Sequence, residues 1–127
     1  MINTTNIHHS YRELKVLNGI NINVKKGEFV SIIGASGAGK STLLHILGTL
    51  EKPTKGHLEI NNQNLSNFSD KKLSEFRNNE IGFIFQFHNL LSEFTAFENI
   101  CIPGYISKKS KKEVENNAIE LMKKLNI

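Results

Sequence analysis

Cysteine, tryptophan and proline are scarce in this sequence. Its 127 residues include one cysteine, two prolines and no tryptophan. A single thiol, Cys101, cannot form an intrachain disulfide, so the fold must depend on packing, and the composition favours the cytosol over an oxidising compartment. No apolar run reaches the length of a membrane span, and the N-terminus lacks the basic and apolar regions of a signal peptide. We therefore expect one soluble domain.

A large excess of one charge is also missing. Sixteen basic and twelve acidic residues give a net charge of +4, which by itself selects no class of partner. Six of the basic residues lie within 108–124, where Glu113, Glu115 and Glu120 interleave, a pattern typical of a solvated helix face. No aromatic residues alternate with a basic cluster, as they do in base-stacking modules, so we do not expect nucleic-acid binding.

The first half of the chain contains a strand, a glycine-rich loop and a helix in that order. Val16 and Leu17 are apolar, and over 20–24 apolar residues alternate with asparagine, the period of a half-buried strand. The run 29–33 is almost continuously apolar and is bounded by glycines, which predicts a strand buried on both faces of a parallel sheet. From Lys40 onwards the apolar spacing favours a helix, which Gly48 weakens and Pro53 ends. This order is typical of an α/β fold.

The middle of the chain contains further patterns that predict strands and a helix. Residues 58–60 alternate and lead into Asn61-Asn62, which predicts a strand and a turn, and Ser69 is suited to cap a short helix. A second apolar run, 81–85, predicts another buried strand. It ends at Gln86, at the carboxyl end of that strand, where open α/β sheets place their ligands.

Two capping boxes mark helices near the C-terminus. Thr95-Ala96-Phe97-Glu98 predicts the start of a helix that ends before Pro103. Ser110-Lys111-Lys112-Glu113 predicts the start of a second helix, and its apolar residues lie on one face that needs a packing partner.

The glycine-rich loop, Gly34-Ala35-Ser36-Gly37-Ala38-Gly39-Lys40-Ser41, matches the phosphate-binding pattern G-x-x-x-x-G-K-S/T. Glycines let backbone N–H groups converge on phosphate oxygens, and the next helix directs its free N–H groups and positive dipole end at the same anion. Lys40 is expected to reach the β- and γ-phosphates, Ser41 to ligate Mg²⁺, and Thr42 to add a hydroxyl at the α-phosphate. A glycine-rich turn without a ligand remains the alternative.

Two other glycine motifs do not fit this loop. A serine-hydrolase elbow requires glycine where the sequence has Ala38. A dinucleotide fingerprint requires a different glycine spacing and gives Lys40-Ser41 no role.

Several stretches resemble the ATP-binding subunit of an ABC transporter, namely 24–29, 36–44 and Gln86 after 83–85. Others resemble its lipoprotein-releasing (LolD-like) and macrolide-exporter branch, namely 45–50, 76–78, 81–91 and 93–100. The resemblance covers essentially all 127 residues. The resemblance implies an α/β P-loop NTPase core of the ABC ATPase type. Its parts are an antiparallel β subdomain (1–27 and about 56–68), a P-loop strand and helix (28–50), a Q-loop strand (80–86) and the start of a helical subdomain (87–127).

The resemblance also implies roles for two residues outside the loop. Tyr11 matches the aromatic residue that stacks on adenine, with a tyrosine that merely covers a strand edge as the alternative. Gln86 matches the Q-loop glutamine, whose amide oxygen approaches Mg²⁺ or the attacking water, with a simple strand cap as the alternative. Residues 87–99 are expected to face the membrane subunits.

The implied function is ATP binding, and hydrolysis in the complete protein, to power export or release of a hydrophobic, lipoprotein-like substrate. The implied partners are membrane permease subunits and a second ATP-binding subunit, and the implied location is the cytoplasmic face of the cell membrane. The sequence lacks the family's Leu-Ser-Gly-Gly-Gln signature and catalytic Asp-Glu segment. We therefore expect the 127-residue chain alone to hydrolyse no ATP and to bind it weakly or not at all, with Lys40 and Gln86 in supporting roles. A non-catalytic module that only packs on a partner is the alternative.

The histidines and the cysteine are not expected to form a metal site. His8 and His9 are adjacent on a predicted strand, so their side chains point to opposite faces. The other three, His45, His57 and His88, are dispersed, which favours surface or packing roles over zinc. Cys101 lies between two isoleucines and is expected to be a small buried residue.

Overall fold

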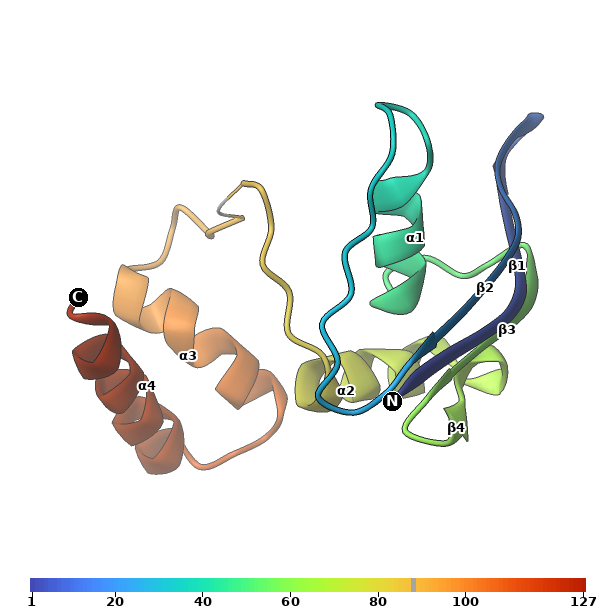
Figure 1. Ribbon diagram of the computed structural model, residues 1–127. Helices are drawn as coiled ribbons and strands as arrows, with labels where there is room; N and C mark the ends of the chain where they lie inside the picture. The colour runs from blue at the N-terminus through green and yellow to red at the C-terminus, as the bar shows by residue number, and fades with distance from the viewer. Residues whose placement is uncertain (88) are drawn as a thin grey trace. The chain divides into compact units, whose positions relative to one another are not determined.

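The computed structural model describes residues 1–87 and 89–127 (Figure 1), so the expectation for His88 lies outside the described residues. The chain forms two compact units, Met1–Ser74 and Glu75–Ile127, and each is described by itself. Across the described ranges, no helix combines the length and apolar character that crossing a bilayer requires.

The first unit is built on an antiparallel sheet of order β2-β1-β3-β4 (Figure 1). Its strands are β1 (Ile2–Tyr11), β2 (Leu14–Val24), β3 (Lys55–Ile60) and β4 (Gln63–Asn64). β1 and β2 form a hairpin whose last pair is Tyr11 with Leu14, and the turn between them holds Arg12 at a positive φ of 54°. The expected N-terminal antiparallel part of the fold is therefore present, and it places Tyr11 at the end of a hairpin.

Helix α1 (Lys40–Leu47) follows the glycine loop and packs on this sheet. Its residues Leu43 and Ile46 are one helical turn apart, so they share a face, and they form a buried cluster with Ile7 of β1 and Leu17 of β2. Each such side chain contributes about 1.5–3 kcal/mol when it is fully buried. This cluster anchors the helix, and therefore the C-terminal end of the loop, to the sheet. The predicted helix is confirmed, but it ends at Gly48, its C-cap, and not at Pro53 as expected.

Neither apolar run that was expected to form a buried parallel strand does so. Residues 29–33 have no strand structure, and Phe29 is 101% exposed. Residues 81–85 are likewise irregular, and Ile84 is 103% exposed. A parallel strand needs hydrogen-bonded neighbours, and within the described part of the chain β1 to β4 pair only with one another. Of the strand and helix expected over 28–50, only the helix is present. The prediction of a strand over 80–86 is wrong.

A short connection joins the sheet to helix α2 (Asp70–Glu80), which spans the boundary between the units. The 3-10 helix η1 (Leu65–Asn67) follows β4 and buries Leu65. Ser69 accepts a 3.3 Å hydrogen bond from the N–H of Lys72, and Leu73 and Phe76 are buried, as expected for this helix.

The second unit pairs helices α3 (Ala96–Ile106) and α4 (Lys111–Leu125). Cys101 is buried between them with Val114 and Ala118, which confirms the expectation of a small buried cysteine. At Gly104 an added Cβ would lie 2.8 Å from both Cγ atoms of Val114, so glycine allows the close approach of the two helices. The expected apolar face of α4 is thus partly covered by α3.

Both helices begin at the predicted cap residues, and the full capping box is found at Thr95. Thr95 Oγ1 accepts from the N–H of Glu98, and the Glu98 carboxylate accepts from the N–H of Thr95. These bonds from the Thr95 backbone and hydroxyl lower the pKa of Glu98. The cap's contribution to stability is therefore full at neutral pH and is lost as the pH falls through that lowered pKa. Ser110 accepts from the N–H of Glu113 at the start of α4.

The expected end of the first of these helices is wrong. Helix α3 continues through Pro103 to Ile106, although a proline inside a helix removes a hydrogen bond and typically costs about 3 kcal/mol or more. The buried contact of Cys101 and Gly104 with α4 lies on both sides of Pro103, and this tertiary packing outweighs the local preference.

Candidate functional site

The glycine-rich loop has the backbone shape that its sequence predicts. Gly37 and Gly39 have φ values of 78° and 86°, in the left-handed region that costs other residues strain. The N–H of Ala38 donates to the carbonyl of Ala35 at 3.2 Å, which closes a turn inside the loop. Gly39 is the N-cap of α1, so the loop passes directly into the helix.

Lys40 lies across this loop. Its Nζ donates hydrogen bonds to the carbonyl oxygens of Gly34 at 2.9 Å and Ala35 at 2.7 Å. The ammonium group is therefore held over the same loop whose residues Ser36, Gly37 and Ala38 are exposed. A positive charge thus lies beside accessible backbone, which is the arrangement that an anion requires.

The N-terminus of α1 adds further donors. The N–H of Leu43 makes a hydrogen bond to the carbonyl of Gly39 at 2.9 Å. By helix geometry, the N–H groups of Lys40, Ser41 and Thr42 precede this bond and face the loop, at the positive end of the helix dipole. Ser41 is exposed, whereas Thr42 is buried against the sheet unit. The loop and the helix therefore converge on one anion-binding position.

Tyr11 is brought to this helix from the end of β1. Its hydroxyl lies 3.5 Å from Oγ1 of Thr42 and donates a 2.7 Å hydrogen bond to Oε2 of Glu51. The side chain is 46% exposed, so much of the ring is open to a ligand. The structure therefore brings together Tyr11 and the phosphate loop, which are separate in sequence.

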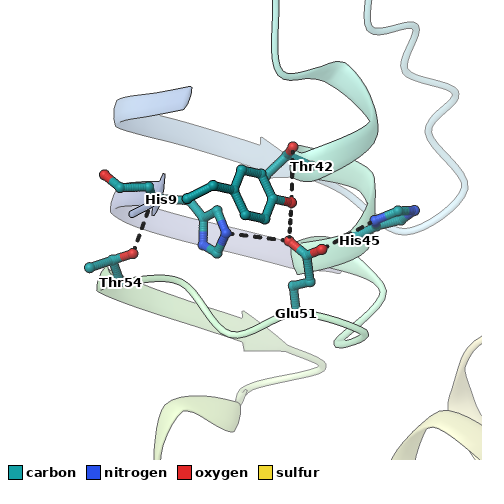
Figure 2. Close-up of polar contacts among 7 residues, drawn as sticks. His9, Thr42, His45, Glu51 and Thr54 are labelled. Carbon is teal, nitrogen blue, oxygen red and sulfur yellow. Dashed lines mark hydrogen bonds and ion pairs between the residues drawn. The ribbon is translucent and has the colours of Figure 1, made fainter. Parts of the chain in front are cut away.

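The residues around Glu51 were not anticipated from the sequence. Figure 2 shows the Glu51 carboxylate between the rings of His9 and His45. His9 Nε2 lies 3.4 Å from one carboxylate oxygen, and His45 Nδ1 lies 3.7 Å from the other. Glu51 follows the end of α1 and matches no motif, so only the folded hairpin reveals this contact. Among the residues that the structure describes, no His, Cys, Asp and Glu side chains form a group of three or more suited to a metal ion.

Gln86 belongs to the second unit. Its side chain is exposed and follows the irregular segment 81–85 instead of a strand. Because no strand precedes it, Gln86 does not cap a strand. The roles of Gln86 and Ser41 as metal ligands stay predictions.

Asn99 organises the segment that follows Gln86 in sequence. Its Nδ2 lies within hydrogen-bonding distance of three carbonyl oxygens, those of Leu91, Phe94 and Thr95, at 3.0–3.1 Å. Its Oδ1 accepts a 2.9 Å hydrogen bond from the N–H of Leu91. One amide thus fixes residues 91–95 against the start of α3.

Replacing Asn99 with alanine is expected to release this segment. Leaving hydrogen-bonding groups without their partner costs about 1–3 kcal/mol, so the Leu91 amide should exchange with solvent about 5- to 100-fold faster. Asn79→Ala is the matched control, because Asn79 makes a single exposed bond to the carbonyl of Glu75. Equal exchange of the Leu91 amide in the wild type and the Asn99 variant would show that Asn99 does not hold residues 91–95 in place. Hydrogen exchange followed by NMR measures it.

A loop with left-handed glycines, a lysine held across it and a helix that starts within it define a P-loop nucleotide-binding fold. The N-terminal antiparallel sheet and the helices that follow it narrow the choice among the classes of P-loop protein. The chain belongs to the ABC transporter family, whose model matches residues 17–127.

Curated relatives support this family and the lipoprotein-releasing branch. The chain is 54% identical over 121 residues to the lipoprotein-releasing system ATP-binding protein LolD of Cytophaga hutchinsonii, covering 95% of this chain and 55% of that protein. It is 49% identical over 127 residues to the protein of the same name from Porphyromonas gingivalis, covering 100% of this chain and 58% of that protein. The chain therefore spans little more than half the length of these relatives.

Solved structures show the same fold. The ATP-binding cassette MJ0796, in a dimeric post-hydrolysis state bound to ADP and Pi, superposes with a TM-score of 0.88 at 38% identity. That superposition covers 97% of this chain and 56% of MJ0796. A second neighbour, cbiO1 from Clostridium perfringens, has a TM-score of 0.80 at 26% identity and is covered over 50% of its length. The expected fold class, an ABC ATPase core with an N-terminal antiparallel sheet, is confirmed.

Proposed function

We propose that this chain binds Mg-ATP, weakly when it is alone, as part of an ABC transporter ATPase that powers release of a lipoprotein-like substrate. The observation that carries the proposal is the loop 34–42, where Lys40, exposed backbone and the N-terminus of α1 converge. The names of the relatives and the ADP bound to MJ0796 support the choice of nucleotide and transport system.

Each loop residue has a role in this proposal. The Lys40 ammonium exchanges its carbonyl contacts for the β- and γ-phosphates, and the backbone of 34–39 surrounds them. Thr42 offers its hydroxyl to the α-phosphate. The exposed Ser41 hydroxyl fits Mg²⁺, which prefers oxygen ligands. In the second unit, Gln86 carries an exposed amide oxygen, which is also a type of ligand that Mg²⁺ accepts. When bound, Mg²⁺ neutralises charge on the phosphates during attack by water.

The proposed partners are membrane permease subunits and a second ATP-binding subunit. The dimeric state of MJ0796 supports the second subunit, and family membership supports the permease, on the cytoplasmic face of the membrane. Residues 87–99 are proposed to face the permease, and within them Asn99 holds the backbone of Leu91, Phe94 and Thr95. Hydrolysis is proposed for the complete protein, and the 127-residue chain alone is proposed to be inactive because it contains no signature segment.

Calorimetric titration of the chain with Mg-ATP, Mg-ADP and Mg-GTP, up to millimolar concentrations, tests the nucleotide assignment. Heat that depends on Lys40 is expected with ATP and ADP, because both carry the phosphates that the loop contacts. No heat that depends on Lys40 would instead favour a module that packs on a partner without binding nucleotide. A strong preference for GTP would contradict an ABC ATPase.

Tyr11→Ala tests the proposed base platform. Stacking of a base on an aromatic ring is worth about 1–3 kcal/mol, so the variant should bind Mg-ATP about 5- to 100-fold more weakly. Inorganic tripolyphosphate has no base, and its affinity should stay unchanged. If both ligands lose affinity equally, Tyr11 supports the strand edge and does not contact the base. Competition between each ligand and a labelled ATP analogue gives both affinities.

A further inference from the structure

The Glu51 carboxylate is the hydrogen-bond acceptor for the Tyr11 hydroxyl. The 2.7 Å distance is typical of a strong bond between a hydroxyl and a carboxylate. The two residues are 40 positions apart and meet because β1 and the end of α1 pack in the same unit. No role described so far accounts for this carboxylate.

His9 and His45 flank the carboxylate on two sides (Figure 2). The two rings lie within ion-pairing distance of different carboxylate oxygens, as given above. His9 also packs its ring edge-on against Tyr11, with centroids 4.8 Å apart and planes at 78°. The ring of Tyr11 is thus fixed at its hydroxyl by Glu51 and along its edge by His9, while much of its surface stays exposed.

We propose that Glu51 is a positioning residue for base recognition. Through the Tyr11 hydroxyl it holds the aromatic ring in the orientation on which adenine stacks, so the ring is ordered before the nucleotide arrives. This inference rests on the proposed function, because it takes Tyr11 as the base platform. An exposed side chain loses conformational freedom when a ligand immobilises it, and ordering it beforehand removes that cost from binding.

The neighbouring threonine supports this role. Thr42 Oγ1 lies 3.5 Å from the Tyr11 hydroxyl, on the helix that begins at the phosphate loop. The Tyr11 hydroxyl therefore lies between Glu51 and a residue of the proposed phosphate site. Fixing it sets the distance between the base platform and the loop, which matters only for a ligand that carries both a base and phosphates.

Glu51→Ala and Glu51→Gln in the 127-residue chain, each titrated with Mg-ATP and with tripolyphosphate, test the inference. Ordering one side chain is worth about 0.5–1.5 kcal/mol, so Glu51→Ala should weaken ATP binding about twofold to tenfold. Glu51→Gln should recover most of this loss, because its amide oxygen still accepts from the Tyr11 hydroxyl. Tripolyphosphate affinity should stay unchanged in both variants, which also shows that the loop remains folded.

A second pair of variants tests whether Glu51 acts through the Tyr11 hydroxyl. In Tyr11→Phe, which lacks the donor, Glu51→Ala should cause no further loss of ATP affinity. The same loss in both backgrounds, an equal loss of tripolyphosphate binding, or no loss in the wild-type background would each overturn the positioning role. ATP binding that depends on Lys40 but is insensitive to Glu51→Ala would overturn this inference alone. Absence of any ATP binding by the wild-type chain would overturn the proposed function and this inference together.

Discussion

Lys40→Ala is expected to weaken Mg-ATP binding by about 10- to 100-fold. The Lys40 Nζ is the charge held over the loop by the carbonyls of Gly34 and Ala35, and a hydrogen bond to a charged group is worth about 1.5–3 kcal/mol. The substitution removes that charge and leaves the glycine conformations in place. Calorimetric titration of both proteins at the same ionic strength measures the difference.

A lysine outside the loop provides the control for general attraction between charges. Lys109 is half-exposed and pairs with Glu113 at 3.6 Å in the second unit, so Lys109→Ala removes one positive charge without touching the loop. ATP affinity should be unchanged in this variant. Equal losses from Lys40→Ala and Lys109→Ala would mean that ATP binds to the basic surface and not to the loop.

Gly39→Ala is expected to destabilise the first unit by about 2–5 kcal/mol. The left-handed backbone costs a residue with a Cβ about 1–2 kcal/mol, and overpacking adds about 1–3 kcal/mol. The overpacking arises because the new Cβ would lie 2.9 Å from Leu17 Cδ2 and 3.1 Å from the carbonyl oxygen of Val16. The loop joins α1 at this position, so ATP affinity should fall as well.

Gly37→Ala separates these two costs. Gly37 has a similar φ of 78°, but no atom lies within 4 Å of an added Cβ. This variant should lose only the backbone term, about 1–2 kcal/mol. Denaturant unfolding followed by circular dichroism compares the variants. Equal destabilisation would show that Gly39 does not pack against β2.

The local features of this fold could be predicted from sequence because short-range chemistry determines them. The loop fixes two glycine conformations, a helix begins at Lys40, and serine and threonine side chains cap α3 and α4. Each depends on residues that lie close together in sequence, within the loop 34–41 or within one turn of a helix start, and so needs no knowledge of the rest of the chain.

The absence of strands over 29–33 and 81–85 could not be predicted in this way. Their apolar composition is suited to a buried parallel sheet, but a strand forms only where neighbouring strands supply hydrogen-bonding partners. The described strands pair among themselves instead, and the apolar side chains Phe29 and Ile84 are left exposed. The prediction that helix α3 ends before Pro103 was wrong for a similar reason, because packing against α4 decides the length of α3.

Some residues of the candidate site could be predicted from the sequence, and others could not. The loop residues carry their own pattern, and Tyr11 was reached through family resemblance. Glu51 and His9 have no motif, since their contact with Tyr11 exists only when the hairpin end meets the end of α1. A buried or half-buried charge beside a candidate ligand platform is therefore visible only in three dimensions.

Backbone amide shifts of the isotope-labelled chain during titration with Mg-ATP test the central claim most directly. The account predicts that the largest shifts fall on Gly37, Gly39, Lys40 and Ser41, followed by Tyr11, because these groups surround the proposed phosphates and base. Tripolyphosphate should shift the same loop amides and leave Tyr11 nearly unchanged. Shifts confined to the lysine-rich helix α4, or no shifts in the loop at saturating nucleotide, would contradict it.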